Sequence, residues 1–301
     1  MSLRVMPHDS ILGATVVGLD LADPRTDAEL ELIRHSMATY GFLRFPDQNL
    51  QEQHMVNFAS EFGSLEINVA TTNRDVPFPQ VMTLSNILED GVKIGFSDAG
   101  QGWHTDMSYS KPIALANMLY GVKVPVRDGE PLGDTQFADM ALAYDMLPDN
   151  VKAKIANLSA EHDFNKFWEM MRAKPGSDRP PLTDEQRTEK PPVVHPIVMR
   201  HPVSRRRILY CNPGYATRII GLSMDESDDL LNLLFEHQLQ ERFFYSFKWT
   251  ERDVLLFDNI RTLHNAVPDY KAHEHRLLKR CQVMADEVVK FSEENSFVYA
   301  D

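Results

Sequence analysis

The chain has 301 residues, of which 43% are hydrophobic and 25% are charged, and its formal net charge is −13 at pH 7. These proportions are those of a folded protein with one large domain or two smaller ones. The acidic balance argues against a general DNA- or RNA-binding protein, and no apolar run approaches the roughly 18 residues that span a membrane.

The first part of the chain is predicted to alternate short helices with strands. Hydrophobic residues at helical spacing predict an amphipathic helix over residues 27–40, and residues 42–45 read as a short strand. A second helix is expected at about 50–62, with Asn49 and Glu52 as its capping pair.

The middle of the chain combines loops with a buried strand. Residues 64–102 are rich in loop-forming residues and contain one predicted strand at 81–85. The apolar run at 113–124 predicts a strand that is buried on both faces. Two helices are expected at 139–147 and 150–158, because a proline separates them.

Residues 168–193 differ in composition, because prolines and charges replace the apolar pattern. We interpret this segment as a lid or an insertion loop within a domain, and a disordered insertion fits the composition equally well. The elements predicted after it are a helix at 225–240 and strands at 193–199, 208–211, 243–249, 253–257 and 276–284. The whole pattern favours an α+β fold with an antiparallel sheet core and helices on one side.

Only two cysteines occur, Cys211 and Cys281, so neither a disulfide framework nor a cysteine metal site is expected. The first residues also lack the basic and then apolar pattern of a secretion signal. We therefore expect a cytoplasmic protein.

The sequence His104-Thr105-Asp106 is the strongest candidate for chemistry. A strand brings residues i and i+2 to one face, so His104 and Asp106 could offer a nitrogen and an oxygen to one metal ion. His264 is the candidate third ligand, because it follows an apolar strand and the polar pair Asp258-Asn259, which could orient a ligand. Two histidines and one carboxylate are the ligand set of non-haem Fe(II) oxygenases.

The motif His-x-Asp is weak by itself, since about one match is expected by chance among eleven histidines. His104 is nevertheless the only histidine with an acidic residue two places later. The signatures HExxH, GxGxxG, GxSxG and the Walker loop are absent. The basic residues Arg276, Lys279 and Arg280 could bind a small anion, although Lys279 also fits a solvated strand edge.

Several segments, in order and at long spacing over most of the chain, resemble the taurine dioxygenase / 2,4-dichlorophenoxyacetate dioxygenase family of Fe(II)- and 2-oxoglutarate-dependent oxygenases. They are Leu12–Leu21, Phe58–Glu66, Trp103–Asp106, Gly133–Tyr144, Phe257–His264 and Arg276–Arg280. The resemblance implies one domain over residues 1–301 with a double-stranded β-helix (jelly-roll) core and flanking helices.

By this resemblance, His104, Asp106 and His264 are the catalytic iron ligands. Thr135 and Arg276 would hold the distal carboxylate of 2-oxoglutarate, a role that suits a planar guanidinium and a hydroxyl donor. The implied cofactors are Fe(II), 2-oxoglutarate as co-substrate, and O₂. The implied reaction hydroxylates an unactivated C–H bond and gives succinate and CO₂, with C–X cleavage where the hydroxylated carbon bears an ether, amine or sulfonate.

Substrate positions depart from the taurine pattern. Arg280 matches the position that holds the substrate anion, but Asn68 stands where a histidine is expected and Gly100 where an asparagine is expected. We therefore expect a small anionic substrate other than taurine. Nucleic acid and membrane partners are not expected, whereas a homo-oligomer is, because relatives form dimers or tetramers.

Two other functions use the same residues. A zinc-dependent hydrolase could use the His-Asp-His group with a bound water, and a non-catalytic barrel could bind a small acid there. Thr135 and Arg276 discriminate between these functions, because a hydrolase has no need of a keto-acid site.

Overall fold

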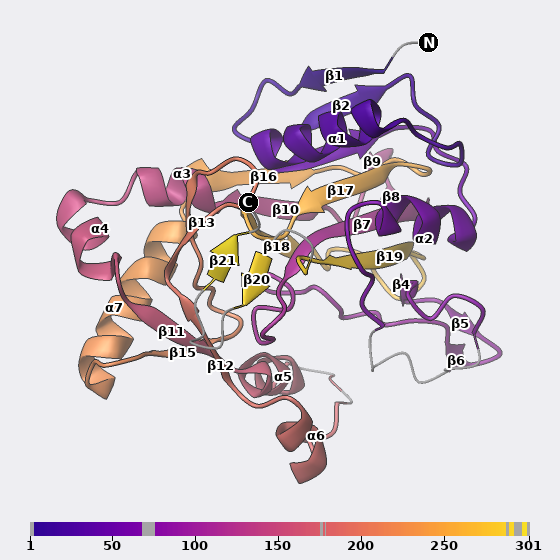
Figure 1. The fold of residues 1–301 in the computed structure, drawn as a ribbon. Helices are drawn as coiled ribbons and strands as arrows, with labels where there is room; N and C mark the ends of the chain where they lie inside the picture. Colours follow the sequence, from indigo (N-terminus) through magenta and orange to yellow (C-terminus); the bar gives the residue numbers. More distant parts are fainter. Residues whose placement is uncertain are drawn as a thin grey trace.

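The computed structural model describes residues 3–67, 76–174, 177 and 179–286, and the backbone of 289–291 and 297–299. Its largest feature is a seven-stranded sheet in the order β1-β2-β3-β17-β7-β19-β4 (Figure 1). These strands are β1 (Arg4–Pro7), β2 (Ala14–Val17), β3 (Phe42–Phe45), β17 (Val254–Asp258), β7 (Ala114–Lys123), β19 (Leu277–Met284) and β4 (Met82–Ser85). Every neighbouring pair is antiparallel except β2 and β3.

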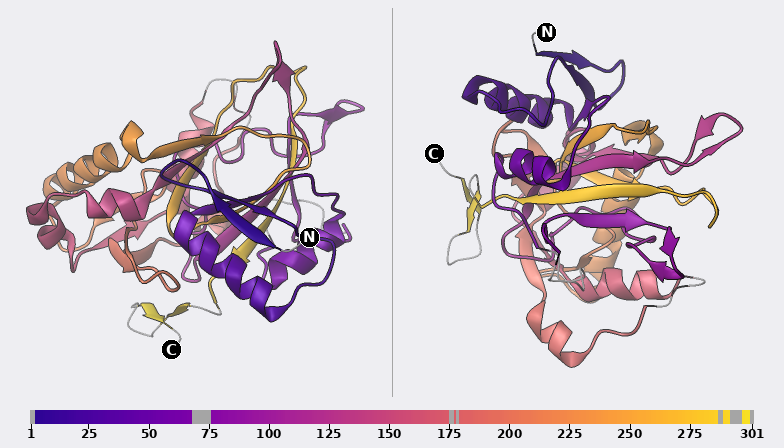
Figure 2. Two further views of the ribbon diagram at one scale, coloured as in Figure 1. Left: turned by 90° about the horizontal axis from the view of Figure 1, so that it is seen from above. Right: turned by 90° about the vertical axis from the view of Figure 1, so that its right-hand side faces the viewer.

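Two three-stranded sheets accompany the large one. The first has the order β16-β10-β18 and the second β12-β11-β15. Their strands are β16 (Phe244–Phe247), β10 (Thr135–Asp139), β18 (Thr262–Ala266), β12 (Val193–Pro196), β11 (Ser159–His162) and β15 (Ala216–Ile219). Two-stranded pairs are β5 (Leu88–Glu89) with β6 (Val92–Lys93), β8 (Val126–Arg127) with β9 (Glu130–Pro131), β13 (Val198–Arg200) with β14 (Arg207–Leu209), and β20 (Val289–Phe291) with β21 (Phe297–Tyr299). The hairpin of β8 and β9 projects beyond the large sheet (Figure 2).

The centre of the large sheet is buried on both faces, as strand β17 shows. Its residues Leu255 and Phe257 join a hydrophobic cluster with Phe137 of β10 and Phe247 of β16, so the large sheet packs on the first small sheet. The alternate residues of β17 join another cluster that includes residues of α1 (Asp27–Tyr40) and α2 (Glu52–Ser60). This two-sided burial explains why the strand reads as a continuous apolar run.

The remaining helices lie elsewhere. Helices α3 (Met140–Asp145), α4 (Asp149–Ile155) and α7 (Met224–Gln238) gather with β11 and β15 on the left of Figure 1 around a separate hydrophobic cluster. Helix α5 (Phe164–Arg172), helix α6 (Asp184–Glu189) and the 3-10 turn η1 (Glu241–Phe243) complete the set. The mixed composition agrees with the predicted α+β class, but the prediction of helices on one side holds only for α1 and α2.

Capping residues determine where helices α1 and α2 begin. Thr26 caps α1 through a reciprocal pair of hydrogen bonds with Glu29, and Gly41 ends the helix with φ 79°. Helix α2 begins at Glu52, and its N-cap is Gln51, whose N–H donates to Nδ1 of His54. The predicted capping pair of Asn49 and Glu52 is therefore wrong.

Helices α5 and α6 occupy much of the segment that composition assigned to a loop. Residues 168–172 form the end of α5, and the interval down to β12 contains α6. Residues 175, 176 and 178 of the predicted segment lie outside the described residues. Among the residues that are described, no helix is long and apolar enough to cross a membrane.

Because His162 and His195 are buried, we expect the free energy of unfolding to fall at acidic pH. Burial lowers the pKa of His195 to about 4 and that of His162 well below its usual value. Below pH 6.5 the unfolded chain takes up protons that the folded chain refuses, so stability falls as the pH drops from 6.5 towards 4. Between pH 7 and pH 5, His195 alone should cost about 2 kcal/mol of unfolding free energy.

Urea unfolding of metal-free protein at pH 7 and pH 5 measures this term. His195→Gln should lose less stability than the wild type over that interval, whereas His35→Gln, a change at an exposed side chain, should match the wild type. An equal loss in His195→Gln and wild type would show that His195 is not responsible.

Candidate functional site

Three potential metal ligands converge beside β18. The backbones of His104 and His264 form an antiparallel bridge, with N–O distances of 3.1 and 2.8 Å. Asp106 lies in the turn that follows, so the predicted strand geometry applies to His104 but not to Asp106. Nε2 of His104 lies 3.6 Å from Oδ1 of Asp106, and Nε2 of His264 lies 3.7 Å from Oδ2. One ligand atom from each of the three residues lies within 4.8 Å of the others.

Backbone contacts orient two of these side chains. Nδ1 of His104 lies 2.7 Å from the carbonyl oxygen of Gly102, which makes Nδ1 the protonated nitrogen and leaves Nε2 as a lone-pair donor. The amide of Asn259 accepts a hydrogen bond from the N–H of Asp106 at 3.1 Å and donates one to its carbonyl at 2.8 Å. Asn259 therefore fixes the backbone that carries the carboxylate.

The other member of the polar pair, Asp258, does not reach the ligands. One carboxylate oxygen accepts the N–H groups of Ile260 and Arg261, and the other lies 2.7 Å from Nε2 of His201. Both side chains of the Asp258–His201 pair are fully buried. Asp258 thus holds the turn that leads into β18, and it acts on His264 only through the backbone.

The electrostatics suit a divalent cation. Burial alone would raise the pKa of Asp106. The Arg280 guanidinium and the two imidazoles lower it by more than burial raises it, so the pKa lies well below the usual range. Burial and the neighbouring His104 lower the pKa of His264 to about 3. The group therefore presents a carboxylate and a neutral imidazole at pH 7 together with the oriented Nε2 of His104, a donor set that fits a mononuclear Fe(II) centre.

A cavity opens beside His264. Alternate residues of β19 point into it, because Leu278 and Arg280 line the cavity while Lys279 pairs on the other side with Glu52 of α2 at 2.8 Å. The full lining is Leu84, Ala99, Gly100, Leu119, Thr135, Phe257, His264, Ala266, Arg276, Leu278 and Arg280. The structure thus brings the predicted co-substrate residues, one predicted ligand and Arg280 to one cavity.

Arg276 is a buried cation, and it forms no ion pair with a carboxylate within the described part of the chain. Its side chain is 6% exposed, and its Nη2 donates to the carbonyl of Gly133 at 3.1 Å. The ring centre of Tyr270 lies 5.8 Å from the guanidinium carbon. Gly133 has φ +75°, and a Cβ there would lie 2.6 Å from Nε of Arg276, so this close approach requires glycine.

Thr135 opens β10 and is held by a tryptophan. Its Oγ1 accepts a hydrogen bond from Nε1 of Trp249 at 3.0 Å, which leaves the hydroxyl proton of Thr135 available to a ligand. Sequence reasoning did not identify Trp249, Gly133 or Tyr270 as part of this site. For Trp249 a signal existed, because a buried indole N–H usually needs an acceptor.

Aromatic side chains pack on His104. Phe167 of α5 has its ring centre 5.0 Å from that of His104, and Tyr215 lies 6.2 Å away. The ring centres of Tyr109 and Tyr215 lie 4.7 Å apart, and the ammonium of Lys190 lies 5.2 Å from the Tyr109 ring centre. Helix α5 and the segment after it therefore pack on the site.

The structure describes one of the two predicted substrate residues, Arg280, but not the other, Asn68. Arg280 lies at the site, and its Nη1 is 3.0 Å from Oδ2 of Asp106. Asn68 lies outside the described residues.

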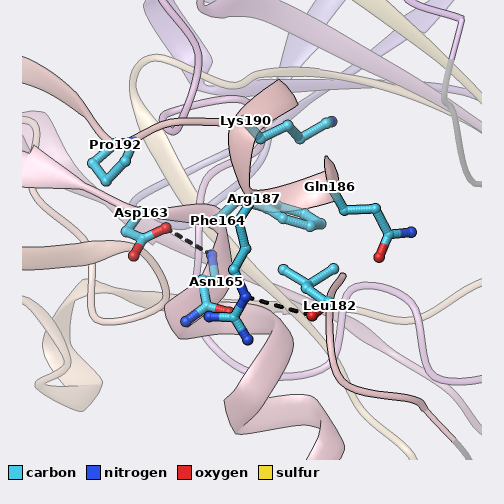
Figure 3. A pocket seen from close by; sticks show the side chains of 8 residues that line it. All are labelled: Asp163, Phe164, Asn165, Leu182, Gln186, Arg187, Lys190 and Pro192. Atoms are coloured by element: carbon cyan, nitrogen blue, oxygen red, sulfur yellow. Dashed lines mark hydrogen bonds between the residues drawn. The ribbon is translucent and has the colours of Figure 1, made fainter. Parts of the chain in front are cut away.

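A second cavity lies between α5 and α6 (Figure 3). It is lined by Asp163, Phe164, Asn165, Leu182, Gln186, Arg187, Lys190 and Pro192. Asp163 accepts the backbone N–H of Asn165 as the cap of α5, and Arg187 donates to the carbonyl of Leu182. These polar groups serve the local fold, and no metal-ligand residue reaches this cavity, so the chemistry belongs to the first one.

Comparisons with known proteins identify the family of this chain. The model of the family "Taurine catabolism dioxygenase TauD, TfdA family" matches residues 4–282. The α-ketoglutarate-dependent 2,4-dichlorophenoxyacetate dioxygenase of Cupriavidus pinatubonensis is 31% identical over 300 residues, which cover 96% of this chain and 100% of that protein. An α-ketoglutarate-dependent sulfonate dioxygenase of Saccharomyces cerevisiae is 28% identical over 96% of this chain and 68% of that protein. The structure of AAD-2 in complex with Mn(II) and N-oxalylglycine has a TM-score of 0.78 and 29% identity, and the alignment covers 94% of this chain and 97% of that chain.

The buried group of two histidines and one carboxylate matches the ligand set of non-haem Fe(II) oxygenases. The chain belongs to the TauD, TfdA family, whose model matches nearly all of it. It is an oxidoreductase, a 2-oxoglutarate-dependent dioxygenase, and it uses Fe(II), 2-oxoglutarate and O₂.

Proposed function

We propose that His104, Asp106 and His264 are the iron ligands of this dioxygenase, and that Thr135 and Arg276 bind the distal carboxylate of 2-oxoglutarate. The observation that carries the proposal is the buried guanidinium of Arg276, which shares one cavity with His264 and lacks a carboxylate partner among the described residues. A buried cation of this kind needs an anion, and a planar guanidinium suits a carboxylate.

The reaction we propose hydroxylates an unactivated C–H bond of a small anionic substrate and gives succinate and CO₂. When bound, iron and 2-oxoglutarate supply the oxidising chemistry. The protein's own residues bind the keto acid at Arg276, exclude water with the ring of Phe167, and offer Arg280 to the substrate anion. A hydroxylated carbon that bears an ether, amine or sulfonate would lose that group by C–X cleavage.

The anionic substrate is supported by Arg280 and by the relatives. 2,4-Dichlorophenoxyacetate and sulfonates, on which the two relatives act by name, are anions at neutral pH. We include Asn68 among the substrate residues and do not propose taurine, because Asn68 and Gly100 differ from the taurine pattern.

A zinc-dependent hydrolase at the same ligands is the weaker proposal. Zinc commonly takes three protein ligands and a water, but a hydrolase would leave Arg276 without a function. A non-catalytic barrel that binds a small acid would in turn leave the His-Asp-His group without one.

We further propose that the large sheet and the sheet β16-β10-β18 form the two sides of a double-stranded β-helix in a single domain. The hydrophobic cluster shared by Phe137 and Phe257 supports this arrangement. We propose that residues 168–193 act as a lid, because residues 168–172 form the end of α5 and the preceding residue of that helix, Phe167, packs on His104. A cytoplasmic homo-oligomer is the corresponding proposal for the assembly, and both cysteines are free and buried, as expected of a reducing compartment.

The proposed function is tested with the wild-type protein. Fe(II) and 2-oxoglutarate together, without air, should give a visible charge-transfer band that neither gives alone. In air, a panel of carboxylates and sulfonates, with 2,4-dichlorophenoxyacetate and taurine included, should contain compounds other than taurine that raise succinate formation above the uncoupled background. Absence of both the band and succinate would contradict the proposal and favour the zinc enzyme.

A further inference from the structure

Arg280 contacts a metal ligand directly. Its Nη1 lies 3.0 Å from Oδ2 of Asp106, and its Nη2 lies 3.2 Å from the sulfur of Met82. Both charged side chains are largely buried, with 12% of Arg280 and 10% of Asp106 exposed. Because the pair is desolvated to this extent, removing the charge of either partner is energetically costly.

The same carboxylate faces both Arg280 and the histidines. Oδ2 of Asp106 also lies 3.7 Å from Nε2 of His264, and Oδ1 lies 3.6 Å from Nε2 of His104. A cation bound by these three residues would share the Asp106 carboxylate with the guanidinium. Arg280 compensates Asp106 in the metal-free protein, but it is a like charge beside a bound metal ion.

We propose that Arg280 is the counter-ion of Asp106 and couples metal binding to the binding of an anionic substrate. An anion bound to Arg280 neutralises the charge of the guanidinium. The guanidinium then no longer repels the metal ion, and it no longer competes with the metal for the Asp106 carboxylate. Metal and anion should therefore bind with positive cooperativity, and each should raise the affinity of the other by the same factor. The anion half of this inference rests on the proposed function, whereas the metal half rests on the contact alone.

The test measures Mn(II) affinity in 2-oxoglutarate-free protein, from the electron paramagnetic resonance signal of free Mn(II). The variants are Arg280→Gln, which removes the charge, and Arg280→Lys, which keeps it. The matched control is Lys279→Gln, because Lys279 is the next residue of β19 and pairs with Glu52 away from the site. Thermal unfolding with and without Mn(II) shows whether each variant is folded.

Arg280→Gln should bind Mn(II) more tightly, on the order of tenfold, while Arg280→Lys and Lys279→Gln stay close to the wild type. The metal-free Arg280→Gln protein should also unfold at a lower temperature, because Asp106 loses its partner, and Mn(II) should restore most of the difference. Unchanged or weaker Mn(II) binding in Arg280→Gln would overturn the inference. If that variant does not fold, clearly tighter binding in Arg280→Lys would overturn it.

Wild-type protein tests the anion half without any substitution. Methanesulfonate, a poor ligand for Mn(II), should tighten Mn(II) binding in the wild type and have no effect in Arg280→Gln. If only this methanesulfonate experiment fails, Arg280 is the counter-ion and the substrate role in the proposed function is wrong. If the charge-transfer band forms but Arg280→Gln binds Mn(II) no more tightly, the proposed function stands and this inference fails.

Discussion

Asp106→Ala is expected to abolish Fe(II)-dependent turnover of 2-oxoglutarate, and His104→Ala is expected to do the same. Asp106 is the only anionic member of the ligand group, and its carboxylate lies between the two Nε2 atoms at 3.6 and 3.7 Å. Removing either side chain leaves two ligands, too few to hold the metal in a fixed geometry. Succinate formation at saturating Fe(II) should fall by about 10³-fold or more, to the background level.

The matched control for this experiment is Asp149→Ala, because the Asp149 side chain is fully exposed in the first turn of α4. It should retain wild-type turnover. Asp106→Ala also leaves the buried Arg280 without its carboxylate, so thermal unfolding must show that the variant is folded. Normal turnover in Asp106→Ala or His104→Ala would refute the proposed metal ligands.

The elements that sequence predicted best are those whose signals are local. Helix α1 has the capping box of Thr26 and Glu29 at its start and Gly41 at its end. Each of these signals lies within or directly beside the helix in the sequence. Helix α5 was missed because its buried face consists of Phe167 and Met171 alone, next to a proline-rich and charged segment. Two apolar residues four apart are too short a pattern to predict a helix.

The site was predictable only in part for a related reason. The ligand candidates follow from residue chemistry, but the pairing of Phe137 with His264, which places Thr135 near the ligands, joins segments 127 residues apart. No local pattern encodes such a register. The contacts of Trp249 with Thr135 and of Arg280 with Asp106 likewise depend on how distant strands pack.

Arg276→Leu is expected to raise the 2-oxoglutarate requirement by about 100-fold, because loss of one partner of a buried charge pair costs roughly 2–5 kcal/mol. Arg276→Lys keeps the charge but not the planar pair of donors, so its effect should be intermediate. The measurements are the KM for 2-oxoglutarate and the concentration of 2-oxoglutarate that half-saturates the charge-transfer band. Mn(II) affinity should change little, since Arg276 lines the cavity without contacting a metal-ligand side chain in the described structure.

Two further variants separate a binding role of Arg276 from a merely structural one. Arg127→Leu removes a more exposed arginine of the same region, which pairs with Glu274, and it should leave the KM for 2-oxoglutarate unchanged. Gly133→Ala retains Arg276 but places a Cβ 2.6 Å from its Nε, so the guanidinium must move and the KM should rise. An unchanged KM in Arg276→Leu would mean that the guanidinium does not hold the keto acid. The buried cation would then need another anion, and the substrate would be the first candidate.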